Sequence, residues 1–412
     1  MKNNQNFDIT IIGGSFAGMT AALVLGRAAP SLKIAVVEKL DIVNNSRARD
    51  GRAYAISSKS LQVFKEIGIY EELLENAGKI ADIKITDYKS PFILDFLGRD
   101  VAALAEKREA FLTSERAKAG LELGECLLGQ IIENYHIHNA LRNALLKQEN
   151  ITVFAPNSYE EIEFGDVVKV KLNNSQIINS KLLLACDGRF SPLRRKYQIH
   201  TLEKNYNQLA IVFNISHEKS HNNTAWEKFL TGGPLAILPF KNQHQSSIVW
   251  IAPTKEAEAI LQLDEENFAQ QLMKKMENAL GEVKVISDKF SYPLIAIEAE
   301  KFYHEKMLLI GDAACGVHPI AGQGFNLAIA GIEILKELIL ENLDDISSQN
   351  LINSYNKKAK RNAQKMLIAT DILNSLFETK SLSVAIARDI GLGLVNKLPK
   401  LKNFFIKNAG GF

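Results

Sequence analysis

Residues 7–18 read FDITIIGGSFAG, an apolar and β-branched run that ends directly in a glycine turn. The pattern predicts a buried strand followed by a helix over about 15–27. In this setting Gly13 allows a tight turn, Ser15 stands where the backbone approaches a pyrophosphate, and Gly18 lets the helix pack closely on the strand. The helix N-terminus adds positive dipole for the phosphates. The stretch therefore predicts a dinucleotide-binding turn made by Gly13, Gly14, Ser15, Ala17 and Gly18.

A second apolar strand is expected over 33–38, which completes a βαβ unit of ordinary size. It ends at Glu38, 20 residues after Gly18. A carboxylate at that point can accept hydrogen bonds from both ribose hydroxyls and would repel a 2′-phosphate, so NADP is disfavoured here. Glu38 and the adjacent Lys39 are accordingly placed in the predicted nucleotide site.

The stretch 308–326 repeats the logic of a strand that enters a tight turn before a helix. Asp312 follows Gly311 at the end of the strand, where its carboxylate can accept hydrogen bonds from a polyol chain. A long helix then opens in the residues Gly322, Gln323, Gly324, Phe325 and Asn326, and its amide-rich start can stabilise negative charge on a reduced flavin. An NAD enzyme has no ribityl chain to bind in this way, so the two glycine turns together indicate FAD.

The chain has 412 residues, more than one compact core usually supports. We expect an α/β protein in which a Rossmann-like FAD-binding domain is interleaved with a mixed β-sheet substrate domain and ends in helices. We expect the FAD-binding domain to contain residues 1–80 with the βαβ unit and the flavin loop (50–57), residues 131–200 with the Asp187-Gly188 pair (the DG motif), and residues 301–346 with the Gly311-Asp312 pair (the GD motif). The substrate domain is expected over 81–130 and 201–300, and C-terminal helices are expected over 347–412.

Composition excludes several classes of function. A net charge of +2, without a basic arm or a zinc-finger spacing, argues against nucleic acid as a partner. The three cysteines form no CxxC pair, and His136 and His138, at i and i+2, do not face each other on a helix. We therefore expect no metal site and take both histidines as surface polar residues. No signal peptide and no apolar stretch of about 20 residues is visible, so a cytoplasmic protein is expected.

The C-terminal part of the chain is strongly basic. From Leu351 onward, 11 Lys and Arg stand against three Asp and Glu, and the final stretch is rich in Leu, Ile and Phe. This mixture suits the surface of an anionic membrane, which would place the protein at the inner face of that membrane. A helical bundle with a solvated basic face explains the same pattern and stays open as the alternative.

Three motifs resemble the single-component, class A flavoprotein monooxygenases. They are GDAACGVHPIAGQGFNLAIAG over 311–331, ACDGRFSPLRR over 185–195 and DGRAYAIS over 50–57. The resemblance implies that Asp187, Gly188 and Arg194 contact FAD and serve a transient nicotinamide site. It also implies that Arg52 and Ala53 lie beside the isoalloxazine ring, in a mobile flavin loop.

Further stretches, LGQIIENYHIHNAL over 128–141, VWIAP over 249–253 and RDIGLGLVNKLPKLK over 388–402, are similar to the ubiquinone-biosynthesis hydroxylases, and the likeness covers essentially the whole chain. Within that family, the resemblance is to the 2-polyprenylphenol hydroxylase type. It implies ring hydroxylation of a polyprenylated phenol with O2 through a flavin C4a-hydroperoxide. The electrons would come from NAD(P)H or a reduced ferredoxin-type donor, and a quinone-biosynthesis protein complex is an implied partner.

The resemblance also assigns site residues. Arg52, His318 and Pro319 fall at the reactive edge of the flavin, although His318 is not expected to act as a base, and Gln130 matches a position that touches the cofactor. Ser15 replaces a glycine of the family, and Cys315 stands where the family has histidine. Neither position supplies a reacting group, so these departures would tune binding rather than abolish activity.

Several alternatives remain open at this level. The chain could hydroxylate another aromatic substrate, or serve as a non-catalytic FAD-bound scaffold of a quinone-biosynthesis assembly. A flavin-dependent halogenase would need a Trp-x-Trp-x-x-Ile motif, and neither Trp226 nor Trp250 lies in one. A prenyl-chain reductase would share the nucleotide turn but not the HPIAGQGFN stretch over 318–326.

Overall fold

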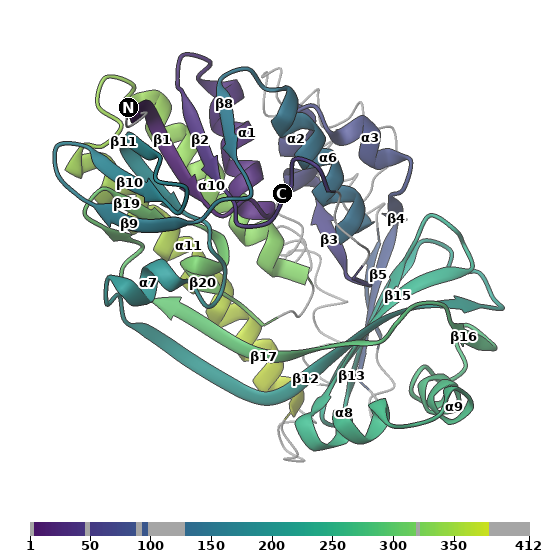
Figure 1. Cartoon of the computed structure of the whole chain (residues 1–412). Helices are drawn as coiled ribbons and strands as arrows, with labels where there is room; N and C mark the ends of the chain where they lie inside the picture. Colours follow the sequence, from purple (N-terminus) through teal and green to yellow (C-terminus); the bar gives the residue numbers. More distant parts are fainter. Residues whose placement is uncertain (1–3, 46–49, 88–92, 98–127, 319–321, 379–412) are drawn as a thin grey trace, which may run out of the picture.

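The computed structural model describes residues 4–45, 50–87, 93–97, 128–318 and 322–378, which form two large sheets and a small one (Figure 1). The chain enters the first large sheet, crosses to the second, returns, crosses again and comes back near its end. The expected interleaved α/β architecture is confirmed, whereas the domain boundaries stay a prediction. The basic tail beyond residue 378 lies outside the described residues.

The first sheet carries the predicted βαβ unit. Its central strands are parallel because helix α1 (Phe16–Ala28) connects β1 to β2 across one face. Strand β1 begins three residues before the predicted strand. The order is β18-β19-β11-β1-β2-β8, with β9 and β10 attached to β11. The strands are β1 (Asn4–Ile12), β2 (Ile34–Val37), β8 (Ile151–Phe154), β9 (Tyr159–Glu163), β10 (Val168–Leu172), β11 (Ile177–Ala185), β18 (Tyr303–His304) and β19 (Met307–Leu309).

Helices cover this sheet and lead into the small one. Helix α1 packs against α6 and α10, and α11 packs against α10. The helices here are α2 (Ser58–Glu66), α3 (Tyr70–Leu74), α6 (Asn134–Lys147), α7 (Pro192–Lys196), the 3-10 turn η1 (Gly311–Ala313), α10 (Gln323–Glu341) and α11 (Gln349–Glu378). The small antiparallel sheet contains β3 (Ala53–Ser57), β4 (Gly78–Ile80) and β7 (Gly129–Glu133), with β7 in the middle.

The second large sheet has the order β20-β17-β12-β15-β14-β13-β5-β6, with β16 beside β12. Helices α8 (Thr254–Leu261) and α9 (Glu265–Lys275) lie below it in Figure 1 and leave its other face toward the first sheet. The strands are β5 (Asp82–Asp87), β6 (Ile93–Leu97), β12 (Thr201–His217), β13 (Thr224–Leu230), β14 (Gly233–Pro239), β15 (Gln245–Pro253), β16 (Val283–Val285), β17 (Phe290–Ala299) and β20 (Cys315–Gly316).

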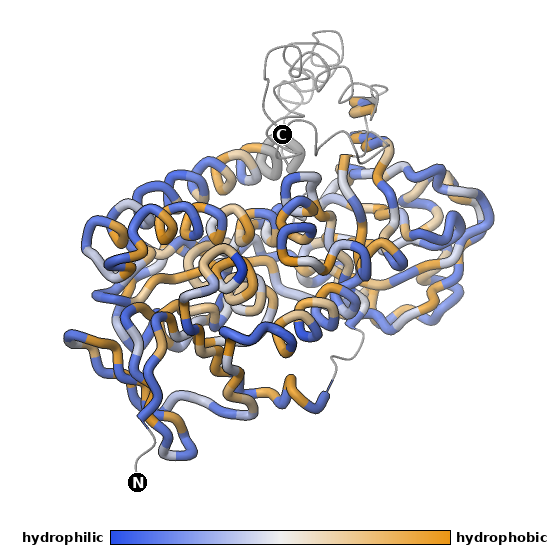
Figure 2. The backbone as a smooth tube through the Cα atoms, turned by 90° about the horizontal axis from the view of Figure 1, so that it is seen from above, coloured by the Kyte–Doolittle hydropathy of each residue, from blue (hydrophilic) through white to orange (hydrophobic). Residues whose placement is uncertain are grey.

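Each large sheet has a core of its own. The larger core fills the space between the first sheet and its helices, and a second core joins the outer face of the second sheet to α8 and α9 through residues such as Trp250, Phe213 and Phe268. Along the helices, hydrophilic and hydrophobic stretches alternate (Figure 2), as expected of amphipathic helices that bury one face. Within the described residues, no helix combines the length and low polarity needed to cross a membrane.

Candidate functional site

The glycine turn after β1 has the geometry of a phosphate-binding turn. Gly13 has φ +104°, and a Cβ there would lie 2.4 Å from the carbonyl oxygen of Cys186. A Cβ on Gly18 would lie 1.8 Å from the carbonyl oxygen of Gly13, so both positions need glycine. Ser15 is the N-cap of α1, and its side chain makes no capping hydrogen bond. The turn therefore offers the free backbone amides of a helix N-terminus to an anion.

Glu38 lies directly beside this turn. The side chain is buried, and its Oε2 accepts a hydrogen bond of 2.6 Å from the Gly14 amide. Its Oε1 accepts a second one from the Leu40 amide at 2.9 Å. A carboxylate fixed in this way at the end of β2 is placed as the sequence predicted for a ribose partner. Lys39, the next residue, is exposed.

An aromatic cluster that the sequence did not predict fixes the turn from the other side. The ring of Phe16 lies edge-on to Phe325 at 5.1 Å, to Tyr54 at 5.4 Å and to His138 at 6.1 Å between centroids. The expectation that His138 is a surface residue is wrong, because its side chain is only 5% exposed. The missed signal is its spacing, since 138, 141 and 145 share one apolar face of α6. The cluster joins all three predicted flavin-binding segments.

The start of α10 meets the predicted flavin loop. Gly322 caps the helix in the left-handed conformation, with φ +64°, and a Cβ at this position would lie 3.1 Å from the Ala55 Cβ. Asn326 donates to the Ala55 carbonyl at 2.9 Å and accepts hydrogen bonds from the Ser57 amide and the Ser60 hydroxyl at 3.1 and 2.8 Å. Gln323 is buried beside it, Gly324 follows in the first turn, and Pro319 lies outside the described residues. The helix dipole is thereby directed at β3.

Arg52 connects this loop to the second sheet. Its guanidinium pairs with Asp50 at 2.5 Å, and its Cζ lies 5.3 Å from the centre of the Tyr292 ring on β17. Asn134 also donates to the Asp50 carboxylate. Burial alone would lower the pKa of Arg52, but Tyr54 and the Asp50 carboxylate hold it above its ordinary value. Arg52 is therefore a fixed cation immediately before Ala53 of β3, and Asp50 and Asn134 are partners that the sequence did not predict.

The DG motif after β11 is tied internally to the GD motif. Asp187 accepts a hydrogen bond from the Leu193 amide through one oxygen at 3.0 Å, and its other oxygen has no partner among the described residues. Gly188 has φ +85°, and a Cβ there would have nothing within 4 Å. Arg194 is 3% exposed and donates to the Ala313 and Arg189 carbonyls, both at 2.8 Å. Its contact with FAD stays a prediction, while its observed contacts join the two motifs.

Arg189 is a site residue that sequence reasoning missed. It donates to the Asp312 carboxylate at 3.2 Å and to the Ile295 carbonyl at 3.1 Å. A Cβ on Gly316 would lie 2.7 Å from its Nε, so the guanidinium lies close against the strand after η1. In the sequence, the only sign of a role for Arg189 was its position directly after Asp187 and Gly188. Arg189 thus orients the carboxylate that was predicted to bind a polyol chain.

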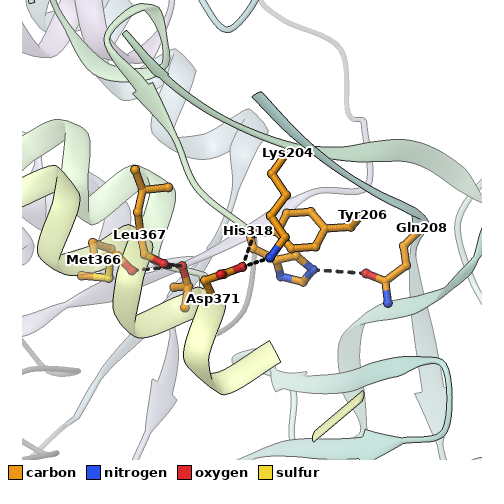
Figure 3. A network of polar contacts seen from close by, with 8 residues as sticks. Lys204, Tyr206, Gln208, His318, Met366, Leu367 and Asp371 are labelled. Carbon is orange, nitrogen blue, oxygen red and sulfur yellow. Dashed lines mark hydrogen bonds and ion pairs between the residues drawn. The ribbon is translucent and has the colours of Figure 1, made fainter. Parts of the chain in front are cut away.

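His318 is buried against strand β12 of the second sheet. Its Nε2 lies 3.4 Å from Gln208 Oε1, and Tyr206 is edge-on to its ring at 4.7 Å (Figure 3). Beside them, Asp371 of α11 pairs with Lys204 and accepts a hydrogen bond of 3.3 Å from the Tyr206 hydroxyl. Burial lowers the pKa of His318 to about 4, against a smaller opposite effect of Asp371. The imidazole is therefore neutral at pH 7.

Strand β12 bends where it supplies these contacts. Its pairing with β17 shifts register between Asn205 and Leu209, and Asn207 has φ +54°. A bulge of this kind redirects side chains that a regular strand would point elsewhere. Tyr206 and Gln208 reach His318 for this reason, and an alternating pattern in the sequence gives no sign of it.

The predicted residues fit FAD. The turn at Gly13 and Gly18 leaves no room for a Cβ, the carboxylate of Glu38 is fixed beside it, and α10 opens on a left-handed glycine at β3. Gln130 of β7 is 2% exposed and reaches the Tyr70 hydroxyl with its amide, while its Oε1 has no partner among the described residues. Orphaned buried acceptors are rare in folded proteins and indicate groups that a ligand can satisfy. In the part of the chain that the structure describes, no group of three or more His, Cys, Asp or Glu is arranged to hold a metal ion.

Comparison with known structures shows the same fold in a flavin enzyme. A crystal structure of p-nitrophenol 4-monooxygenase from Pseudomonas putida superposes with a TM-score of 0.76 over 98% of this chain and 99% of that one, at 15% identity. A probable FAD-dependent monooxygenase from Pseudomonas aeruginosa superposes with a TM-score of 0.73 over 94% and 99%. At such low identity the likeness concerns the fold alone.

Sequence comparison is more specific. The FAD binding domain family matches residues 6–370. The ubiquinone hydroxylase UbiL of Rhodospirillum rubrum is 30% identical over 98% of this chain and 89% of its own length, and UbiM of Neisseria meningitidis is 28% identical over 98% and 84%. The chain therefore belongs to the FAD binding domain family, in the group of FAD-dependent monooxygenases that includes the ubiquinone hydroxylases.

Proposed function

We propose that this monooxygenase hydroxylates the aromatic ring of a polyprenylated phenol in ubiquinone biosynthesis. The names of the full-length relatives support this substrate class, because UbiL and UbiM are both ubiquinone hydroxylases. The observation that carries the proposal is the apolar face of the second sheet opposite the flavin-binding segments. This face contains the cluster of Ala210, Val212, Ile251 and Leu294 with Tyr206, Val249 and Tyr292 packed against it.

The position of that apolar face, next to the FAD-binding segments, supports the proposed function more strongly than its composition does. Tyr292 contacts Arg52 beside the flavin loop, and Tyr206 contacts His318 just before the glycine-rich start of α10. An aromatic ring with a hydrocarbon chain can lie against such a surface, since each buried apolar group contributes favourably. The apolar face of the second sheet and the flavin-binding segments therefore lie next to each other.

Bound FAD would supply the redox chemistry and the activation of O2. Glu38 and the turn at Gly13 would hold the adenosine diphosphate end, and Asp312, oriented by Arg189, would accept hydrogen bonds from the polyol chain. Arg52 fixes the flavin loop between Asp50 and Tyr292, and the start of α10 places its dipole at β3. Neutral His318 lends the site a hydrogen-bonding group without adding a charge. The apolar face orients the ring and excludes water.

The electron donor belongs to the same proposal. We take NAD(P)H or a reduced ferredoxin-type protein as the donor, with Asp187 and Arg194 in the segment that would serve it. Anaerobic mixing of the FAD-loaded protein with each donor, followed by flavin absorbance, separates the two, because only the true donor bleaches the flavin at a catalytically useful rate.

The decisive experiment is complementation of strains that are each blocked at one ring hydroxylation of ubiquinone synthesis. We expect quinone synthesis to return in one or more strains, with loss of the matching unhydroxylated intermediate in mass spectra. Failure in every strain, with FAD-loaded protein present, would reject this substrate class and leave hydroxylation of another aromatic compound. A non-catalytic scaffold is favoured if purified yellow protein oxidises no donor while a polyprenylphenol is present.

Location at the membrane is proposed from the sequence of the tail. We place the protein in the cytoplasm, held peripherally at the inner face of the membrane and in contact with other quinone-biosynthesis proteins. The excess of eight positive charges after Leu351, among many Leu, Ile and Phe residues, supports this location. Truncation after Leu398 should weaken sedimentation with vesicles that contain anionic lipid, and unchanged binding would contradict it.

A further inference from the structure

Glu227 stands out among the buried charged residues of the second sheet. It lies in the middle of β13 and is 9% exposed. Among the described residues, its carboxylate makes no hydrogen bond or ion pair, whereas its neighbour Lys228 reaches Glu277 at 2.8 Å on the opposite face. Burial raises the pKa of Glu227 to about 7. A buried carboxylate without a partner costs free energy, so its presence calls for a role.

The strand register places Glu227 on the face that looks toward the flavin-binding segments. On one side, Glu227 is the cross-strand partner of Ala236, Ala236 of Val249, and Val249 of Val212. On the other side, Glu227 is the partner of Ile85, and Ile85 of Leu94. Every one of these neighbours is apolar, so the carboxylate is alone in its row. Val212 and Val249 belong to the apolar cluster of the proposed ring-binding face.

A second apolar cluster borders Glu227 from the other side. Ile85 and Ala225, which is two residues away on the same face of β13, pack in a cluster that also contains Ala53 and Ala55 of β3. Ala55 is the residue beside Gly322, at the start of α10. Glu227 and the small Ala236 therefore lie on the face between two separate apolar clusters, and both clusters reach the flavin loop.

We propose that the Glu227 carboxylate accepts the hydrogen bond of the phenolic hydroxyl of the substrate, and so fixes which ring carbon faces the flavin. The inference rests on the proposed function, because it needs a ring that carries a hydroxyl. The apolar clusters on either side accept the ring and its hydrocarbon chain, and the carboxylate accepts the one polar hydrogen.

The same contact activates the ring. A phenol has a pKa of about 10, above that of Glu227, so the proton stays on the phenol before reaction. As the ring donates electrons to the attacking oxygen, the phenolic proton becomes more acidic and moves along the hydrogen bond to the carboxylate. The phenolic O–H bond breaks as an O–H bond forms on the carboxylate. When the ring regains its aromaticity, the attacked carbon loses its C–H proton to solvent, and the ring oxygen takes the first proton back from the carboxyl group. Such transfer is efficient when the acceptor has a pKa near the working pH.

Among the described residues of β5, β13 and β14, Asp87 is the titratable side chain that shares this face with Glu227, and the residues directly across from Glu227 do not titrate. Ala236 on β14 and Ile85 on β5 are its direct neighbours, and the nearest carboxylate on that face is Asp87, opposite Phe229. Lys84 and Lys228 point to the other face, where both lie over the ring of Trp226. The activity should therefore rise with pH through the titration of Glu227, since only the anion accepts the phenolic proton.

The test uses the full-length, FAD-loaded protein with 2-farnesylphenol and its methyl ether, and follows binding through the flavin absorbance. The wild type should bind the phenol ~10-fold or more tightly than the ether, the usual worth of a hydrogen bond to a charged group. Glu227→Leu should bind both within ~3-fold of each other. Glu227→Gln should keep part of the discrimination and lose the rise of kcat/KM near pH 7. Glu258→Gln, an exposed carboxylate on α8, is the matched control and should behave as the wild type.

The outcomes distinguish failure of the role proposed for Glu227 from failure of the proposed hydroxylase function. Retained discrimination in Glu227→Leu, with the flavin bound normally, overturns the role of Glu227 and leaves the hydroxylase function standing. A wild type that binds neither probe and hydroxylates neither overturns the proposed function, and the inference with it. The isosteric Glu227→Gln variant decides the question if the leucine variant does not fold.

Discussion

The Glu38 carboxylate and the Gly14 amide are joined by a hydrogen bond of 2.6 Å at the end of β2. The contact fixes an anionic acceptor beside the turn that is predicted to bind a pyrophosphate, which is the arrangement expected for a ribose partner. It also explains why position 14 is glycine, because a Cβ there would lie 2.7 Å from the Glu38 Cβ.

Replacing Glu38 with alanine should weaken FAD binding by about 10- to 100-fold, the value expected for lost hydrogen bonds to a charged group. Fluorescence of FAD released on dilution measures the change. Glu71→Ala, which removes an exposed carboxylate on α3, serves as the control. Equal FAD affinity of the two variants would show that Glu38 does not bind the ribose.

Gly13 and Gly188 offer a matched pair for the backbone. Both have positive φ, +104° and +85°, but only at Gly13 would an added Cβ meet the backbone, 2.4 Å from the Cys186 oxygen. Gly188→Ala should therefore cost about 1–2 kcal/mol of strain, and Gly13→Ala should yield protein that is unfolded or free of FAD. The flavin content after purification and the midpoint of urea unfolding decide between these outcomes. Similar losses in the two variants would contradict the steric explanation.

Much of the fold was predictable because local patterns decide it. The βαβ unit, the acidic end of β2 and the start of α10 all depend on residues that are close in sequence, and each was placed within a few residues. The contacts of Arg189, Asn326 and His138 join segments that are far apart, over 123 and 271 residues in two cases. No single sequence specifies such pairs. The bulge that brings Tyr206 and Gln208 to His318 is equally invisible, because a strand pattern carries no record of a register shift.

Glu227 is another residue whose surroundings cannot be predicted from the sequence. The stretch 224–230 reads TAWEKFL, in which Glu227 and Lys228 resemble an ordinary charged pair on a strand. Only the register shows that the two side chains point to opposite faces and that Lys228 has a partner whereas the carboxylate has none among the described residues. The chemistry of the site therefore depends on pairing that becomes visible only in three dimensions.

Arg194 should be important for stability. Its guanidinium is buried and donates to the Ala313 and Arg189 carbonyls, so Arg194→Met leaves one buried and one partly buried acceptor without donors. We expect a loss of about 2–4 kcal/mol in the free energy of unfolding, together with faster loss of FAD. Arg195→Met, at the exposed neighbouring position, should change neither quantity by more than about 0.5 kcal/mol. Denaturant unfolding checks both, and equal stability would mean that the buried guanidinium contributes nothing net.

The buried His318 predicts that the folded protein loses stability in acid. Its pKa is lowered from 6.5 to about 4 by burial, so between these values the unfolded chain binds a proton that the folded chain does not. Stability should therefore fall as the pH drops from 6.5 toward 4, by up to about 3 kcal/mol. His318→Asn should lose this part of the pH dependence, whereas His304→Asn, at a half-buried position, should keep it. Thermal unfolding at several pH values measures the difference, and parallel curves for His318→Asn and the wild type would refute it.

Glu227 predicts the opposite dependence in the same range. Its pKa is raised by burial from 4.5 to about 7, so between these values the folded chain holds a proton that the unfolded chain has lost. Its contribution to stability is complete below pH 4.5 and is lost as the pH rises to 7, by up to about 3 kcal/mol. Glu227→Gln should therefore be more stable than the wild type at pH 8 and no more stable at pH 4.5. In the wild type the two residues offset each other, so only the differences between each variant and the wild type reveal them. A constant difference for Glu227→Gln at all pH values would mean that its carboxylate titrates normally, and would remove the acceptor with a pKa near 7 that ring activation requires.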